Sequence, residues 1–213
     1  MDYPEPFQLK VDPRHGRLLG SPSNYQKKLS DLAGIYRDSA AFDALAQTDG
    51  DRVVYAVQDY RPAFGDNELI FGTTWMAPGR VGDEFFMTRG HIHARADRPE
   101  IYHGQSGHGL MLMESPEGDT RTVEIWADVV CYVPPFWIHR SVNLGDQPLV
   151  MAFTYPVDAG QDYDVIARSN GMRSLIVDDG QGGWVERANP DWRPRTTNQI
   201  ETIHATAHAT VGA

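Results

Sequence analysis

Apolar residues between positions 51 and 156 come in short runs rich in β-branched and aromatic side chains, which predicts β-strands. Turn-forming segments such as APGRVGD, QSGHG, PEGD and LGDQP separate the runs, and nothing in this region has the period of a long helix. Regular short strands with Gly- and Pro-rich turns are typical of an antiparallel sandwich or barrel. The expected fold class is mainly β, with strands at 52–60, 68–75, 84–88, 100–104, 109–115, 120–126, 128–133, 138–144 and 149–156.

The segment before this region has a different pattern. Apolar residues at three- and four-residue spacing among helix formers predict two helices, one over NYQKKLSDLAGIY and one over DSAAFDALAQ. Asp38 or Ser39 can cap the second helix, and the segment TDGD ends it. The apolar positions are Leu29, Leu32 and Ile35 in the first helix and Phe42 and Leu45 in the second.

Both ends of the chain also differ from the β region. Residues 1–23 are rich in proline and are expected to form an extended arm that packs over the body. After the strands, DYDVIARSNG predicts a helical turn or a short helix, and SLIVDDG with GGWVER predicts a terminal hairpin. The small, polar end of the chain predicts a flexible tail. We therefore expect an N-terminal arm with helices over 1–50, a β domain over 51–195 and the tail over 196–213.

Composition excludes several classes of partner. The net charge is −10 and Lys and Arg do not cluster, which argues against nucleic acid. No apolar run reaches the roughly 18 residues of a membrane span, and the N-terminus lacks the pattern of a secretory signal. The single cysteine, Cys131, excludes an intrachain disulfide and is expected to be a buried thiol. Together these features predict a cytoplasmic enzyme or binding protein.

Three histidines and one glutamate are candidates for a metal site. His91 and His93 are two residues apart, so on a strand their side chains point to the same face. An HxH pair alone is weak evidence, but Glu100 and His139 both lie in strand-like apolar sequence that would bring them inward. Imidazole and carboxylate ligands suit a divalent transition ion, and four ligands leave two positions free on an octahedral ion.

The spacing of these ligands resembles the two metal-binding motifs of the cupin superfamily. In the first motif Gly107 follows Glu100 after six residues, although the gap between His93 and Glu100 is longer than usual. The second motif is matched by PPFWIH and the following asparagine, with Phe136 where the family usually has glycine. The resemblance implies a small antiparallel β-barrel or jelly roll, here with N-terminal helices and a C-terminal extension.

Longer strings narrow the resemblance to one group of cupins. The segments GTTWMAPGRVGDEFFMTRGHIHARADRPEIYHGQSGHGLMLMESPEGD, VVCYVPPFWIHRSVNLGDQP and YPVDAGQDY are similar to the cupin-type glucose-6-phosphate isomerases of archaea and some bacteria. The similarity covers residues 25–195 and is densest over 72–164. It implies a metal-dependent aldose–ketose isomerase that interconverts glucose 6-phosphate and fructose 6-phosphate in glycolysis and gluconeogenesis. It also implies a homodimer with one divalent ion per subunit, most often iron(II), with Mn, Ni or Zn as alternatives.

The family's functional residues can be carried over position by position. Glu100 becomes both a metal ligand and the candidate base that moves hydrogen between C1 and C2, and Tyr163 becomes a second candidate catalytic residue. A hydride shift would need no such base, and the sequence leaves both routes open. Arg89 and Arg140 are candidates for charged help at the phosphate. The implied metal ligands are His91, His93, Glu100 and His139, and the implied phosphate and substrate contacts are Tyr55, Thr74, Thr88, Gly90, Tyr102 and Tyr155.

One departure from the family bears on mechanism. Many relatives have histidine before the Asp-Tyr of the string that reads AGQDY here, where this chain has Gln161. If that position moves a proton during ring opening, the ring opens differently or more slowly in this protein.

Two other classes of function remain open at this point. Two free metal positions would also suit a cupin dioxygenase, although the threonines implied at the phosphate argue against it. A non-catalytic sugar-phosphate sensor usually carries an output domain such as a helix-turn-helix, and the sequence contains none.

Overall fold

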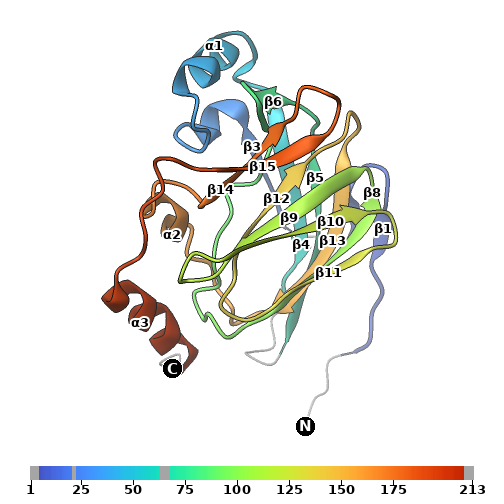
Figure 1. Ribbon diagram of the computed structural model, residues 1–213. Coiled ribbons are helices and arrows are strands. Elements are labelled where there is room, and N and C mark those ends of the chain that lie inside the picture. Colours follow the sequence, from blue (N-terminus) through green and yellow to red (C-terminus); the bar gives the residue numbers. More distant parts are fainter. Residues whose placement is uncertain (1–4, 21–22, 63–67, 209–213) are drawn as a thin grey trace.

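The computed structural model describes residues 5–20, 23–62 and 68–208 and is built mainly from antiparallel strands around one interior, which confirms the predicted fold class (Figure 1). A six-stranded sheet has the order β11-β8-β13-β5-β4-β3, and a three-stranded sheet has the order β10-β9-β12. The strands of these two sheets are β3 (Ser23–Lys28), β4 (Val53–Tyr60), β5 (Leu69–Met76), β8 (Glu100–Ser106), β9 (His108–Glu114), β10 (Thr120–Trp126), β11 (Val130–Val133), β12 (Ile138–Asn143) and β13 (Leu149–Pro156).

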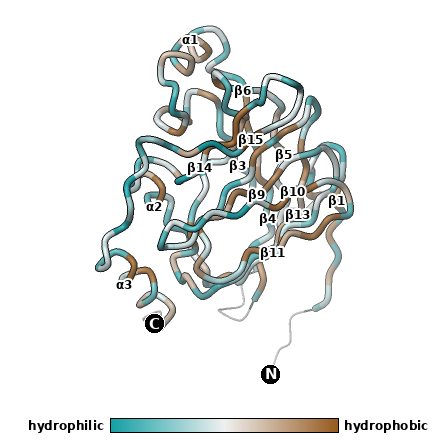
Figure 2. Tube along the Cα trace, viewed as in Figure 1, coloured by the Kyte–Doolittle hydropathy of each residue, from teal (hydrophilic) through white to brown (hydrophobic). Residues whose placement is uncertain are grey.

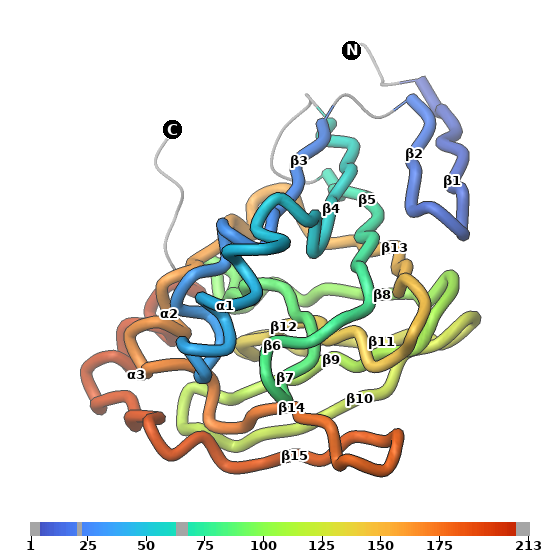
Figure 3. Tube along the Cα trace, turned by 90° about the horizontal axis from the view of Figure 1, so that it is seen from above, coloured from blue at the N-terminus to red at the C-terminus, as the bar shows by residue number. Residues whose placement is uncertain are grey.

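Smaller elements lie around this barrel (Figures 1 and 3). A four-stranded sheet has the order β15-β14-β7-β6, and β1 pairs with β2 near the N-terminus. The helices α2 and α3 lie on the same side of the barrel in both views. These elements are β1 (Lys10–Asp12), β2 (Arg17–Leu19), η1 (Leu29–Leu32), α1 (Ser39–Asp49), β6 (Arg80–Val81), β7 (Glu84–Phe85), α2 (Asp164–Ala167), β14 (Ser174–Asp178), β15 (Trp184–Ala188), α3 (Thr197–Ala205) and η2 (Thr206–His208).

The hydrophobic core fills the interior of the barrel. Hydrophobic stretches lie along strands such as β9 and β13, whereas the connecting turns are mostly hydrophilic (Figure 2). In β9 every residue from Gly109 to Glu114 is buried, and the strand is the central one of its sheet, paired with β10 on one edge and β12 on the other. The thiol of Cys131 is buried, and burial raises its pKa to about 11, as expected for an apolar thiol.

The prediction of a helix over residues 24–36 is wrong. Residues 23–28 form strand β3, which pairs antiparallel with β4, and only the following residues 29–32 form a helical turn. The open edge of β4 offers a ladder of backbone hydrogen bonds that outweighs the weak helix preference of this segment. The apolar spacing that suggested a helix survives in part, because Leu29 and Leu32 are both fully buried.

Other local predictions are confirmed. Helix α1 begins after Asp38, whose Oδ1 accepts a hydrogen bond of 2.9 Å from the backbone N–H of Ala41, as an N-cap does. The short helix α2 and the hairpin of β14 and β15 lie where the sequence predicted them. Within the described residues, no helix is both long and apolar enough to cross a bilayer.

The segment from residue 196 differs from the predicted tail. Helix α3 occupies Thr197–Ala205, and residues 209–213 lie outside the described part of the chain. Thr196 and Gln199 form a reciprocal capping box at its start, and Ile203 is buried against the barrel side. The capping-box spacing was present in the sequence and could have predicted this helix.

We expect Gly104→Ala to lower the free energy of unfolding by at least about 2 kcal/mol, because a Cβ atom at this position would lie 1.9 Å from the carbonyl oxygen of Trp126. Gly145→Ala is the matched control, since its Cβ would find its nearest neighbour at 3.5 Å and the midpoint should barely change. Chemical denaturation of both variants checks the difference. Equal midpoints would contradict the tight packing of β8 against the turn before β11.

Candidate metal centre and cavity

The backbone brings His91 and His139 directly opposite each other. Each backbone N–H donates to the other residue's carbonyl, at 3.0 and 2.9 Å, in an antiparallel bridge between the segment before residue 92 and β12. Residues paired in this way project side chains to the same side of the sheet. The two imidazole centroids are therefore only 4.4 Å apart.

Two further candidate ligands, Glu100 and His93, complete a compact cluster. Glu100 begins β8 with its side chain turned inward, and its Oε2 lies 3.0 Å from His139 Nε2, 3.3 Å from His93 Nε2 and 3.9 Å from His91 Nε2. The candidate ligand atoms of all four residues lie within 4.8 Å of one another. The cluster predicted from the sequence is thus brought together in space.

The donor set fits a metal ion. The Nε2 atoms of His91 and His93 are buried and have no hydrogen-bond partner, which is costly unless another group binds them. The Nδ1 atoms of His93 and His139 lie 2.6 Å from Arg98 O and 3.0 Å from Trp137 O. Such outer bonds fix the imidazole tautomer that presents a bare Nε2 inward, as metal-binding histidines require.

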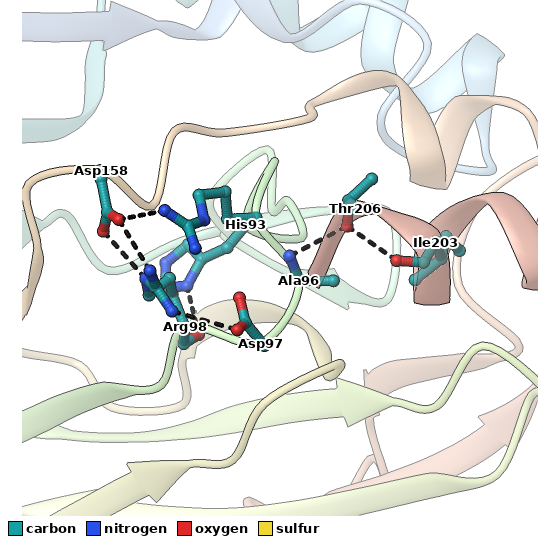
Figure 4. A network of polar contacts seen from close by, with 8 residues as sticks. His93, Ala96, Asp97, Arg98, Asp158, Ile203 and Thr206 are labelled. Carbon is teal, nitrogen blue, oxygen red and sulfur yellow. Dashed lines mark hydrogen bonds and ion pairs between the residues drawn. The ribbon is translucent and has the colours of Figure 1, made fainter. Parts of the chain in front are cut away.

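The loop between His93 and Glu100 is anchored by residues from later in the chain (Figure 4). Arg98 forms a bidentate pair with Asp158, at 2.9 and 2.8 Å, and its carbonyl accepts the hydrogen bond from His93. The backbone N–H of Ala96 donates to Thr206 Oγ1, 3.1 Å away, at the end of α3. The extra residues therefore form an anchored loop that sets the position of His93.

Another anchor explains a departure from the second motif. Phe136 has φ of 71°, the left-handed conformation that the family's usual glycine adopts without strain. Its backbone N–H donates to Ala96 O at 2.6 Å, and its ring lies 5.0 Å from that of His204 in α3. The backbone shape of the motif is kept, and contact with the C-terminal helix accompanies the larger side chain.

Electrostatics in the cluster favour a neutral imidazole at His91 and an ionised carboxylate at Glu100. Burial, followed by the charge of neighbouring His139, lowers the pKa of His91 well below its ordinary value. Burial alone would raise the pKa of Glu100, but the close imidazoles of His139 and His93 outweigh it and bring the pKa well below its usual range. These are the protonation states that metal binding needs.

The cluster opens into a cavity lined by nearly all of the predicted site residues. The exceptions are Arg89, which is outside the lining, and His93, which lines the neighbouring hollow beside α3. Burial raises the pKa of Tyr55 to about 12, so its phenol is a neutral hydrogen-bond donor at physiological pH. The predicted residues around the cavity are Tyr55, Thr74, Thr88, Gly90, His91, Glu100, Tyr102, His139, Tyr155 and Tyr163, together with Arg140 and Gln161.

Side chains at the mouth of the cavity form a small polar network. The phenol of Tyr163 donates a short hydrogen bond to Gln161 Oε1, and its ring lies 5.7 Å from that of His91. The guanidinium of Arg89 stacks 5.2 Å above the same ring. Gln161 is thus a partner of Tyr163 in this chain, at the position where many relatives have histidine.

Sequence reasoning missed Tyr25, which also lines the cavity. The residue lies on β3 opposite Val57 of β4, so it shares the inward face of that sheet. It was overlooked because its segment was expected to be helical, and no local signal indicated the pairing with β4. Asp59 and Arg61, an ion pair of 2.7 Å at the same end of β4, were missed for lack of any motif.

An antiparallel barrel that gathers three imidazoles and one carboxylate at one point defines the cupin class of metal site. Comparison with known sequences gives the family within that class. The family model described as Glucose-6-phosphate isomerase (GPI) matches residues 26–193. The chain belongs to this glucose-6-phosphate isomerase family.

Individual relatives agree with the family assignment. A protein of Sinorhizobium medicae named glucose-6-phosphate isomerase is 56% identical over 94% of this chain and 94% of its own length. The glucose-6-phosphate isomerase of Thermococcus litoralis is 40% identical over 91% of this chain and 100% of its own length. Among solved structures, oxalate oxidase in complex with glycolate is 16% identical with a TM-score of 0.44, covering 52% of this chain and 55% of that chain.

We expect the chelator-treated protein to lose stability as the pH falls from 7 to 5. An unfolded histidine binds a proton below about pH 6.5, whereas folded His91, with its lowered pKa, stays neutral. Its stabilising contribution is therefore complete above that pH and is lost below it, by up to about 1.4 kcal/mol per pH unit. The ionised Glu100 adds a similar loss only at lower pH, below about 4.5.

Guanidinium denaturation at pH 7 and pH 5 measures this loss. His91→Gln should flatten the pH dependence by up to one proton. The same slope in the His91→Gln variant and the unchanged protein would contradict the assignment.

Proposed function

We propose that this protein is a metal-dependent isomerase that interconverts glucose 6-phosphate and fructose 6-phosphate. The observation that carries the proposal is the cluster of His91, His93, Glu100 and His139 at the base of a cavity lined by hydroxyl groups. The family match and the named relatives support the sugar phosphate over the other cupin chemistries.

At the metal end, the four residues His91, His93, Glu100 and His139 would hold a divalent ion, which would supply Lewis-acid polarisation of the sugar's carbonyl group. Glu100 lies beside this point and is ionised, so it can accept a proton from the carbon next to the carbonyl and return it to the former carbonyl carbon, while the hydroxyl proton passes to the former carbonyl oxygen. Tyr163, at the mouth, can hydrogen-bond a sugar hydroxyl. Burial of the cluster excludes bulk water from the reacting carbons.

At the other end, neutral donors suit a phosphoryl group. Thr88 Oγ1 accepts the backbone N–H of Ser141 at 3.0 Å, which leaves its own proton free for the cavity. The hydroxyl of Thr74 and the backbone N–H of Gly90 have no hydrogen-bond partner within the described ranges. Tyr55 and Tyr155 add phenols, and Tyr102 adds a third nearer the cluster.

The rest of the proposal follows the family resemblance. We propose that the ion is iron(II), with Mn, Ni or Zn able to replace it, because imidazole and carboxylate ligands accept all four. We also propose that the protein acts as a cytoplasmic homodimer and meets only its sugar-phosphate substrate, with neither nucleic acid nor membrane as partner. The excess of acidic residues and the single cysteine support this part.

The proposal predicts turnover of fructose 6-phosphate in an assay coupled to glucose-6-phosphate dehydrogenase. Chelator treatment should abolish the rate, and iron(II) or another divalent ion should restore it. Glu100→Gln should remain inactive after metal addition, whereas His103→Gln, on the same strand but outside the cluster, should remain active. No turnover with any added metal, or a rate that resists chelation, would refute the proposed function.

Thr74→Ala should raise KM for the sugar phosphate by roughly tenfold with little change in kcat, because it removes one donor to the phosphoryl group. Thr73→Ala is the matched control on the same strand. Its hydroxyl donates to Gly16 O at 2.6 Å, so the change should lower stability and leave KM unchanged. Steady-state kinetics and thermal unfolding separate the two effects, and an unchanged KM in Thr74→Ala would remove that residue from the site.

A further inference from the structure

Arg140 is a buried arginine beside the cluster whose charge has no carboxylate partner. It follows His139 on β12, is only 5% exposed and lines the same cavity as Thr88 and Gly90. No carboxylate lies within ion-pair distance of its guanidinium in the described part of the chain, and its Nε atom has no partner. Arg195, the other arginine that is at least nine-tenths buried, pairs with Glu114 at 2.7 Å.

The two hydrogen bonds that Arg140 does make are informative. Nη1 donates to the sulfur of Met87 at 2.9 Å, and a thioether is only a weak acceptor. Nη2 donates to the carbonyl oxygen of Arg89 at 2.8 Å. The nearest acidic groups that act on it from neighbouring elements, Glu84 and Glu114, are already bonded elsewhere, to Arg37 N at 2.6 Å and to Arg195.

The bond to Arg89 O fixes one peptide unit. In a planar trans peptide the carbonyl of residue 89 and the N–H of residue 90 point in opposite directions. Holding the oxygen against the guanidinium therefore turns the Gly90 N–H away from Arg140, and no protein acceptor meets it within the described ranges. Gly90 has φ of 75°, and a Cβ atom there would lie 2.7 Å from Ile166 Cδ1, so only glycine allows this peptide orientation.

A buried positive charge without a carboxylate partner is unfavourable, because the guanidinium has lost its hydration without gaining an ion pair. The fold tolerates this cost at a wall of the cavity, next to the free donors that face a phosphoryl group in the proposed function. A bound dianion would offset the cost, because the guanidinium and the polarised peptide would then act on a negative charge in a poorly solvated site.

We propose that Arg140 is a positioning residue for phosphate: it orients and polarises the Arg89–Gly90 peptide so that the Gly90 N–H binds the phosphoryl group, and it supplies the positive charge that the neutral donors lack. This inference rests on the proposed function. It adds to that function the residue that supplies the positive charge of the phosphate subsite, Arg140. The chemical class recognised is a phosphate monoester or inorganic phosphate.

The test compares Arg140→Met and Arg140→Lys with the unchanged protein. Inorganic phosphate is the probe, its binding measured by calorimetry on chelator-treated protein and its inhibition constant measured on the metal-loaded enzyme. Arg140→Met should weaken phosphate binding roughly 10- to 100-fold and raise KM far more than it lowers kcat. Arg140→Lys should lose less, since it keeps the charge and one donor. Arg168→Met, which removes an exposed positive charge paired with Asp162, is the control and should bind phosphate normally.

The unfolding midpoint of the ligand-free Arg140→Met variant distinguishes a phosphate-binding role from a purely structural one, because loss of a structural arginine would lower it. Replacing a buried unpaired charge by an apolar side chain of similar length should leave the ligand-free unfolding midpoint unchanged or raise it. Unchanged phosphate affinity in Arg140→Met, or in Arg140→Lys if the first variant does not fold, overturns the inference while isomerase activity persists. Absence of both phosphate binding and turnover in the unchanged protein would instead refute the proposed function together with this inference.

Discussion

The site depends on one stretch of backbone pairing, between residues 88–91 and β12. Thr88 N donates to Ser141 O at 2.9 Å, and His91 and His139 exchange both of their backbone hydrogen bonds. This short ladder places a candidate metal ligand from each segment on one face. It also places Thr88 and Gly90, the proposed phosphate donors, at a fixed distance along the same segment. Both ends of the proposed substrate are therefore located by the same few hydrogen bonds.

A second constraint is the burial of charge at that ladder. Three imidazoles and a carboxylate lie inside the barrel with two imidazole nitrogens lacking partners, and Arg140 lies nearby without a carboxylate. The two unpartnered imidazole nitrogens and the unpaired guanidinium destabilise the ligand-free fold. The surrounding apolar core and the Arg98–Asp158 pair stabilise it enough to hold them in place. The same desolvation strengthens every interaction that a metal ion or a phosphoryl group would make there.

The sequence predicted the barrel and the metal cluster because their signals are local. Strand runs, turn residues and the HxH spacing need only a few neighbouring positions to be read, and Glu100 and His139 were identified by motif. Tyr25 could not be found in this way, because its place in the cavity depends on a pairing with β4 about thirty residues later. Helix α3 was missed although Thr196 and Gln199 had the capping-box spacing, since the polar composition of the segment suggested a tail.

The elements outside the barrel explain why this chain departs from the shortest form of the cupin motif. The longer gap between His93 and Glu100 would be a loose loop in a bare barrel, and His93 would lose the acceptor that orients its ring. Here Asp158 fixes the loop from one side and Thr206, at the end of α3, fixes it from another. Phe136 keeps the left-handed turn of the second motif while packing on His204. The C-terminal helix therefore supports the candidate metal cluster, because it anchors the loop whose Arg98 carbonyl orients the ring of His93.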